Sequence, residues 1–304
     1  MNKRFGRLTF PYIIWVAVFT IAPLLLVAFF AVTAYDREGN LYFTLQGFRN
    51  IFSGATVTLD WLGLKSIFGL DIQVPVYVSV FLKSLSIAVI ATLISLLLGY
   101  PVAWLLAKLK IAKKRSADFL LFLTVMPMWM NALLRTYAWL ALLEPTGIIN
   151  TFLGNLGIGP VQFLYNDFGI GLGMVYNYLP FMILPIYSVL VKIHPSLLEA
   201  ASDLGADNTY TLRKVIIPLS LPGVYSGINM VLMPAMTTFL IPDLLGGGRY
   251  MLIGNAIQRQ YMISRDYTTG SALTILLLIF VLISMSVVNR NASEMSEEGG
   301  ILNA

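Results

Sequence analysis

The sequence predicts an all-α integral membrane protein with six transmembrane helices and with both termini in the cytoplasm. Of its 304 residues, 58% are apolar and only 12% are charged, whereas soluble domains carry roughly 25% charged residues. Six apolar runs are each longer than the ~20 residues that a helix needs to cross a bilayer. The loops between these runs differ in their content of Lys and Arg, which sets the orientation.

Arg135 is the only charged residue within the six runs. The expected spans cover residues 8–35, 84–107, 119–143, 168–191, 215–242 and 267–289. Residues 145–166 are also free of charge, but five Gly and Pro residues between Gly147 and Pro160 would break a helix there. We expect a short helix plus a loop in this segment, lying on the membrane surface or dipping in from outside.

The membrane domain is expected to cover residues 1–290, and two segments lie outside the spans. Residues 36–83 form an extracytoplasmic insertion that is too short for an independent domain. Within it, Leu41–Leu45 and Val74–Val78 are strand-like or irregular, and Phe48–Phe52 can form one or two helical turns. Residues 291–304 are polar and are expected to form a disordered cytoplasmic tail.

The orientation follows from the distribution of basic residues. With the N-terminus inside, the cytoplasmic segments hold twelve Lys and Arg residues and the outer segments hold seven. The contrast is sharpest between residues 108–117, which hold five, and residues 144–168, which hold none. The net charge of +5 therefore reflects topology in a lipid membrane, and it gives no support to a nucleic-acid partner.

Several kinds of chemistry are missing from the chain. It has no Cys and a single His, His194, so thiolate chemistry and a His-rich metal site are excluded. It has no Gly-Lys pair and hence no P-loop, so a partner subunit would have to bind ATP and Mg and hydrolyse the nucleotide. The spans contain no carboxylate, and Glu144 and Asp243 directly follow the outer ends of two of them. We therefore expect a non-catalytic subunit with no bound cofactor.

The cytoplasmic loop of residues 192–214 is the one long polar loop that itself looks folded. Ser196 and Glu199 have the spacing of a capping box, in which each side chain accepts a hydrogen bond from the other residue's backbone N–H. Leu197, Ala201 and Leu204 recur on one helical face. A helix of about nine residues is not stable alone in water, so we expect this one to dock on a partner.

Two residues are expected to set the ends of the loop's helices. Gly205 lies where a left-handed residue ends a helix. Asn208 can cap a second helix, which continues through Arg213 and Lys214 into the next span.

This loop resembles the EAA signature of ABC-importer permeases. Glu199-Ala200-Ala201 is followed by Gly205 and then by Val215-Ile216-Ile217-Pro218, where Val215 and Ile217 replace the usual Ile and Leu. The resemblance implies a type I ABC-importer permease architecture, with a coupling helix that inserts into a groove of the ATP-binding subunit. The residues expected to make this contact are Ser196, Leu197, Leu198, Glu199, Ala200, Ala201, Asp203, Leu204, Gly205 and Ala206.

Other stretches are similar to the spermidine/putrescine branch of that family. They are Leu97–Trp104, Asn131–Arg135, Leu179–Pro185, Asp243–Gly248 and Leu252–Asn255. The resemblance implies a polyamine solute, a heterodimer with a second permease, two copies of an ATP-binding subunit and an extracytoplasmic solute-binding protein. It also implies location in a bacterial plasma membrane.

The candidate residues of the substrate path lie in or beside the third, fourth and fifth spans. They are Trp129, Asn131, Arg135, Glu144, Tyr176, Asn177, Tyr178 and Asp243. On a straight helix from Phe119, Arg135 would rise about 24 Å and lie near the outer interface, either as an anchor or in the path. Asp243 precedes three glycines, and is either a solvated helix end or a cation contact at the pore mouth.

Two alternatives remain open from the residues alone. The first is a permease of the same architecture for another solute, such as an oxyanion or an iron complex. The second is an ion-coupled secondary carrier. A carrier is expected to place ionisable groups at the bilayer midplane, and this sequence has none there.

Overall fold

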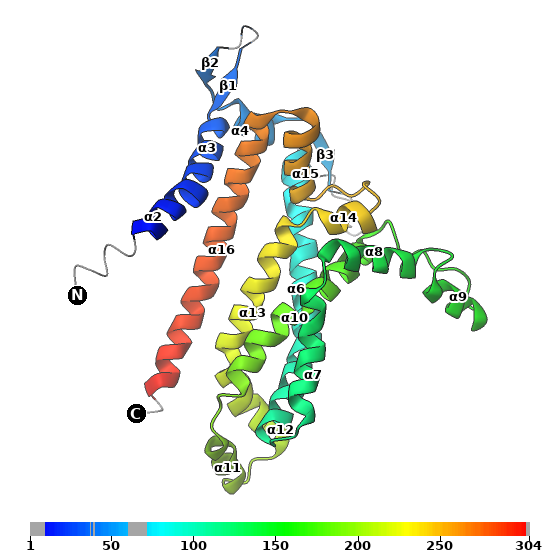
Figure 1. Cartoon of the computed structure of the whole chain (residues 1–304), viewed down its shortest axis with the longest axis vertical. Coiled ribbons are helices and arrows are strands. Elements are labelled where there is room, and N and C mark those ends of the chain that lie inside the picture. The colour runs from blue at the N-terminus through cyan, green and yellow to red at the C-terminus, as the bar shows by residue number, and fades with distance from the viewer. Residues whose placement is uncertain (1–9, 37, 39, 60–71, 302–304) are drawn as a thin grey trace. The chain divides into compact units, whose positions relative to one another are not determined.

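The computed structural model describes residues 10–36, 38, 40–59 and 72–301, and helices form most of these ranges (Figure 1). Within them, five helices are long and apolar enough to cross a membrane. They are Pro11–Ala31, Val76–Ile111, Asp167–Leu190, Asn208–Thr237 and Tyr267–Val288. A bent pair of helices supplies the sixth span if it is counted as one. The chain divides into two compact units, residues 1–82 with 253–281, and residues 83–252 with 282–304.

The first unit combines the N-terminal helices with the described part of the predicted insertion. Its elements are α2 (Phe10–Val16), η1 (Ala17–Ile21), α3 (Ala22–Ala31), β1 (Thr33–Tyr35), β2 (Leu41–Phe43), α4 (Gln46–Ser53), β3 (Thr56–Thr58), β4 (Gln73–Pro75), α15 (Ile253–Arg259) and η5 (Gln260–Ser264). The start of α6 (Val76–Ile111) and the first part of α16 (Tyr267–Ile301) complete it. β1 pairs with β2, and β3 pairs with β4, both antiparallel.

The insertion is held against the start of α16. Asn50 Nδ2 of α4 donates to Thr269 Oγ1 at 3.1 Å. Thr268 Oγ1 donates to the carbonyl of Thr33 at 2.9 Å. A Cβ on Gly47 would lie 2.6 Å from the Thr268 carbonyl oxygen, so only glycine permits this close approach. The strand and helix expected around residues 41 and 48 are present, but residues 76–83 belong to α6 and not to the insertion.

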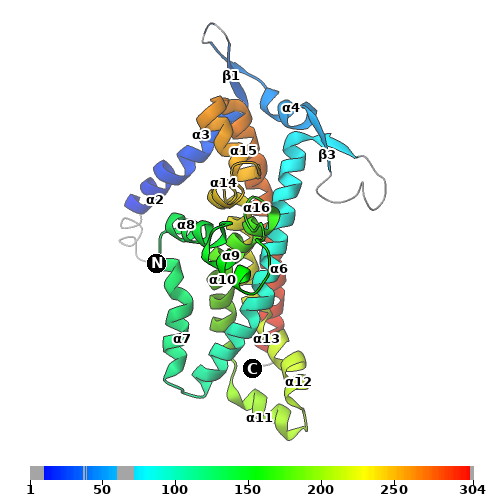
Figure 2. The same ribbon diagram turned by 90° about the vertical axis from the view of Figure 1, so that its right-hand side faces the viewer.

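The second unit is built around α10 and α13. Besides most of α6, its elements are α7 (Ser116–Val125), η3 (Met126–Trp129), α8 (Ala132–Leu143), α9 (Ile148–Asn155), α10 (Asp167–Leu190), α11 (Pro195–Asp203), α12 (Asn208–Thr211), η4 (Leu212–Ile216), α13 (Ile217–Thr237) and α14 (Leu240–Leu245). α11 and α12 lie at one end of α10 and α13, and α8 and α14 lie near the other (Figures 1 and 2).

Small residues let these helices approach closely, as is common between helices in lipid. A Cβ on Gly227 of α13 would lie 2.7 Å from the sulfur of Met182 in α10, and one on Gly99 of α6 would lie 3.1 Å from Met182 Cγ. Met182 is fully buried in the core between α6, α10 and α13. The hydroxyls of Tyr100 and Ser220 are 2.8 Å apart and link α6 to α13.

The third expected span, residues 119–143, is not one straight helix. The segments Ser116–Trp129 and Ala132–Asn155 meet at 96° (Figure 2). Pro127 lies in a short 3-10 turn, Met130 is extended, and Asn131 caps a new helix by accepting from the N–H of Leu133 at 2.8 Å. These three local features end one helix and start another, although the apolar run continues through them.

Two other boundaries differ from the expected ones. The fifth span begins at Asn208 and ends at Thr237, because Thr238 is extended and α14 starts a separate short helix. α16 continues to Ile301, where the sequence predicted a disordered tail, because extending an existing helix needs no new nucleation. The uncharged segment 145–166 forms α9 and a loop, as expected from its glycines.

Candidate functional site

The helix of the polar loop, α11, begins two residues earlier than the predicted cap, Ser196, would allow. Pro195 takes the first helical position, which suits proline, and His194 is the N-cap. His194 Nδ1 accepts from the N–H of Ser196 at 3.3 Å and lies 2.7 Å from its hydroxyl. Ser196 and Glu199 are therefore inside the helix, and the prediction that they form its capping box is wrong.

The far end of α11 is closed as the sequence predicted. Gly205 has a φ of +80°, the left-handed conformation. Its N–H donates to the Ser202 carbonyl at 2.9 Å, and the N–H of Ala206 donates to the Ala201 carbonyl at 3.0 Å, which is the Schellman pattern. The next helix is capped by Asp207, whose carboxylate accepts from the N–H of Tyr210. The prediction that Asn208 caps this helix is therefore wrong, because the cap is the preceding residue.

We call α11 and the turn 204–207 the coupling turn. Its predicted docking face points away from the rest of the unit. Leu204 is 89% exposed and Leu197 is 42% exposed, and Ala201 between them is half-buried. Ser196, Glu199, Ala200 and Asp203 are also exposed. A leucine left this open at the tip of a folded turn is suited to burial in another protein.

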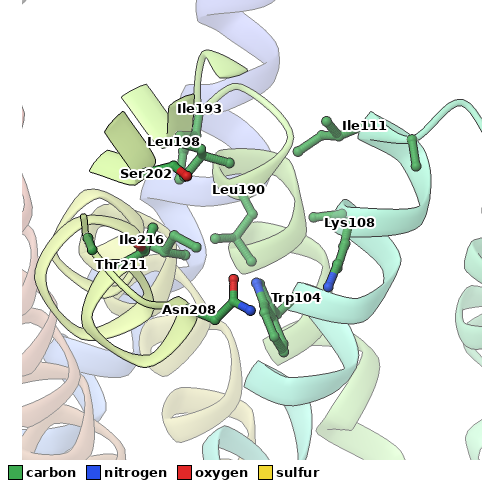
Figure 3. Close-up of a pocket in the computed structure, with 13 residues that line it drawn as sticks. Trp104, Lys108, Ile111, Leu190, Ile193, Leu198, Ser202, Asn208, Thr211 and Ile216 are labelled. Carbon is green, nitrogen blue, oxygen red and sulfur yellow. The ribbon is translucent and has the colours of Figure 1, made fainter. Parts of the chain in front are cut away.

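The other face of α11 borders a cavity of about 350 Å³. Leu198, Ser202 and Ala206 line it from the coupling turn, and Trp104 and Lys108 line it from α6. Lys108 Nζ lies 5.5 Å from the centre of the Trp104 ring, within range of a cation–π contact. Trp104, Lys108 and Asn208 converge on this cavity (Figure 3). The coupling turn therefore does not pack tightly on the ends of α6 and α10.

Three of the candidate path residues, Arg135, Tyr176 and Tyr178, lie on α8 and α10, which pack on each other. Trp139 and Tyr176 stack edge to face with ring centres 5.2 Å apart. Arg135 acts electrostatically on the Tyr178 hydroxyl, and that hydroxyl donates to the Pro234 carbonyl at 3.3 Å. Arg135 is only 7% exposed, and its Nε and Nη1 have no hydrogen-bond partner in the described part of the chain. The expectation of a straight helix from Phe119 to Arg135 is wrong, because the bend lies between these two residues.

The other candidate path residues have simpler local roles. Asn177 is buried and donates to the Gly173 carbonyl of its own helix at 2.8 Å, which satisfies its amide there. Asn131 is the exposed cap of α8, and Glu144 is its exposed C-terminal end. Trp129 is exposed and stacks on Phe122, and Asp243 is exposed in the first turn of α14.

No local sequence pattern predicts the pairing of Lys83 with Asp167, whose charged atoms are 3.1 Å apart. The two residues lie far apart in the chain, and each was expected only as a charge in an outer segment. The position of Asp167 depends instead on a contact between distant segments. The loop 164–167 packs against the end of α14, where the N–H of Tyr165 donates to the Leu245 carbonyl at 2.8 Å.

The coupling turn and the helical fold define a class of membrane transport subunit. Residues 96–296 match the model of the family described as binding-protein-dependent transport system inner membrane component, and the chain belongs to this family. It is therefore a multi-pass protein of the bacterial inner membrane with the type I ABC-importer permease fold.

Two curated relatives and two solved structures are similar to this chain. The chain is 37% identical to the spermidine/putrescine transport system permease protein PotB of Haemophilus influenzae, over 95% of each chain. It is 42% identical to PotB of Escherichia coli K12, over 71% of this chain and 80% of that one. Among solved structures, a bacterial ABC transporter that imports the polysaccharide alginate aligns with a TM-score of 0.68 at 17% identity, covering 96% of this chain and 95% of that chain. The MetNI methionine ABC transporter aligns with a TM-score of 0.54 at 17% identity, covering 72% and 95%.

Proposed function

We propose that this chain is a permease subunit of an ATP-driven importer of polyamines such as spermidine and putrescine. The main observation in support of this proposal is the chain's 37% identity to PotB of Haemophilus influenzae over 95% of both chains. In this proposal, the chain supplies half of the translocation path and a second, homologous permease supplies the other half. Two copies of an ATP-binding subunit and an extracytoplasmic binding protein complete the transporter. The chain itself binds neither ATP nor Mg.

The coupling turn is the proposed contact with the ATP-binding subunit. Its exposed face carries Leu204 and Leu197, and its shape is fixed by the His194 cap and the Gly205 turn. A rigid turn with an exposed apolar tip loses little conformational entropy on docking. The cavity behind it leaves room for the turn to shift when the partner moves.

Transport by the complete complex in proteoliposomes tests this proposal. The assay measures uptake of labelled spermidine or putrescine with the binding protein outside and ATP enclosed. We expect uptake that requires the ATP-binding subunit and that persists when the proton gradient is collapsed at constant ATP. Uptake that follows the gradient would instead indicate a secondary carrier.

A second candidate function is import of an anion such as an oxyanion, and one observation favours it. Arg135 is buried with two guanidinium nitrogens that lack partners in the described part of the chain. A buried guanidinium is strongly stabilised by a bidentate anion. Uptake of labelled phosphate or molybdate by the same vesicles, without polyamine uptake, would establish this function instead. Loss of that uptake in Arg135→Met, with a partial loss in Arg135→Lys because an ammonium cannot bind bidentately, would locate the anion.

A further inference from the structure

Three side chains meet at the end of the second unit that lies opposite the coupling turn. Lys83 Nζ of α6 lies 3.1 Å from Asp167 Oδ1 in the first turn of α10. The same ammonium lies 4.4 Å from the centre of the Tyr250 ring. The side chain of Lys83 is 18% exposed and that of Asp167 is 52% exposed. One ammonium is thus held by a carboxylate and an aromatic face, with the carboxylate open to solvent.

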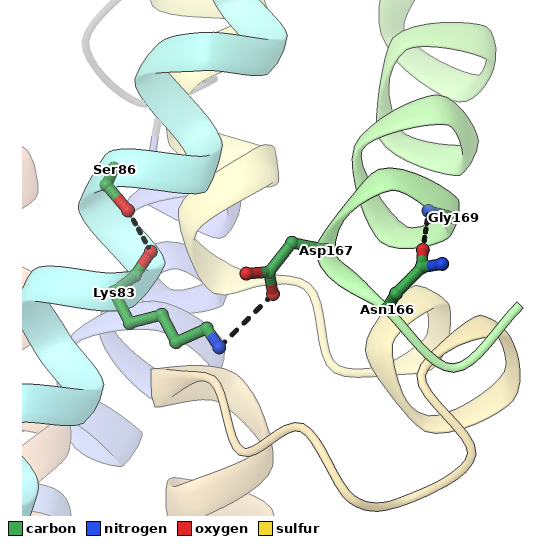
Figure 4. Close-up of polar contacts among 5 residues, drawn as sticks. All are labelled: Lys83, Ser86, Asn166, Asp167 and Gly169. Atoms are coloured by element: carbon green, nitrogen blue, oxygen red, sulfur yellow. Dashed lines mark hydrogen bonds and ion pairs between the residues drawn. The ribbon is translucent and has the colours of Figure 1, made fainter. Parts of the chain in front are cut away.

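The carboxylate is fixed by the start of α10. Asn166 caps this helix by accepting from the N–H of Gly169 at 2.8 Å, as Figure 4 shows beside the ion pair. Asp167 follows the cap, where the helix dipole favours a negative charge. On the other side, Ser86 Oγ donates to the Lys83 carbonyl at 2.8 Å within α6.

The aromatic face is positioned by the glycines that follow α14. Gly247 and Gly248 have φ values of +62° and +68°, a conformation that favours glycine. A Cβ on Gly247 would lie 2.4 Å from the Tyr165 ring, so this glycine lets residues 165–167 approach the turn that leads to Tyr250. The turn therefore sets Tyr250 beside Asp167 in a defined geometry.

A carboxylate and an aromatic face are the two groups that bind an alkylammonium most directly, through a charge-assisted hydrogen bond and a cation–π contact. The Lys83 side chain is itself a primary ammonium on a chain of four methylenes, the same chemistry as the end of a diamine. We propose that Asp167 and Tyr250 form a binding site for a substrate ammonium, and that Lys83 occupies this site until a polyamine displaces it.

This inference rests on the proposed polyamine transport and adds a site to it. Displacement requires that an incoming ammonium reach Asp167, and the 52% exposure of that side chain permits it. It also requires that the internal contact be weak enough to exchange. A partly exposed ion pair contributes little to stability, so a polyamine can compete with Lys83.

Two substitutions distinguish a Lys83 side chain that the substrate displaces from an ion pair that only joins α6 to α10. The first case predicts opposite effects, and the second predicts the same effect. Lys83→Met keeps the length of the side chain and vacates the site, so we expect the polyamine concentration at half-maximal uptake to fall about two- to five-fold. Asp167→Asn removes the attraction for the ammonium, so the same quantity is expected to rise about as much. Both variants break the same ion pair, and a structural tie would make them change uptake in the same direction.

The measurements use the complete transporter in proteoliposomes with saturating binding protein and basal ATP hydrolysis as the folding control. Lys110→Met is the matched control, since Lys110 also pairs with a carboxylate, that of Asp118 at 2.6 Å, at the other end of α6. We expect no change in half-saturation for it. Lys83→Arg should stay close to wild type, and Tyr250→Leu should act like Asp167→Asn.

The wild-type result tests the proposed function, and the comparison of the variants tests the ammonium site. Failure of the wild-type complex to transport any polyamine would refute the function, whatever the variants do. Polyamine uptake by the wild type, combined with equal or parallel effects of Lys83→Met and Asp167→Asn, would refute the ammonium site and leave the function intact.

Discussion

Replacement of Gly205 by Asn, Ala and Val measures how far coupling depends on the left-handed turn. A Cβ at Gly205 would meet no atom within 4 Å, so its φ of +80° is the only source of strain. The left-handed conformation costs an L-residue about 1–2 kcal/mol. Asn tolerates it best and a β-branched residue least. We expect the ratio of intact to open turn to fall about two-fold in Asn, five-fold in Ala and more than ten-fold in Val.

The assay is co-purification of the ATP-binding subunit with the permease, followed by ATP hydrolysis stimulated by the loaded binding protein. Both should decrease in the order Asn, Ala, Val, while the amount of permease in the membrane stays constant. Gly157→Ala is the matched control, because Gly157 has a φ of +77° and open space around its Cβ, but lies in the loop after α9. The reasoning fails if Val retains full coupling, or if Asn and Val lose it equally.

Three further predictions concern other parts of the second unit. Leu204→Asp should abolish co-purification of the ATP-binding subunit without lowering the thermal stability of the permease, because the side chain is 89% exposed; an equal loss of stability would contradict this. Gly227→Leu should lower thermal stability by about 1–3 kcal/mol, because a Cβ at this position would already lie 2.7 Å from the Met182 sulfur. Gly154→Leu is its control, because a Cβ there would meet no atom within 4 Å. Asp243→Asn should reduce polyamine uptake several-fold with basal ATP hydrolysis unchanged, and unaltered uptake would make Asp243 only a solvated helix end.

Local features of the fold were predictable from the sequence. The left-handed residue at Gly205 follows from neighbouring residues alone, and the structure confirms it. The sequence predicts the two helix caps one or two residues too late, because His194 and Asp207 compete successfully with Ser196 and Asn208 as caps. Such competition depends on small free-energy differences between adjacent residues.

Features that depend on contacts between distant segments were not predictable. The bend before Ala132 lies inside a continuous apolar run, and hydropathy does not distinguish a bent helix from a straight one. Consequently, the burial of Arg135 could not be inferred from its position in that run. The pairing of Lys83 with Asp167 and Tyr250 requires the packing of α6, α10 and the glycine turn, which no local pattern encodes.

The unbroken helix from Asn208 to Thr237 has a mechanical consequence. It contains 30 residues and is therefore about 45 Å long. One end adjoins the coupling turn, and the other reaches the break before α14. A rotation of about 10° around the first end displaces the second by about 8 Å, given this length. A small rotation near the coupling turn therefore becomes a larger displacement at the far end of this helix. The π-helical segment Leu212–Ile216 near its start is the natural place for the helix to pivot.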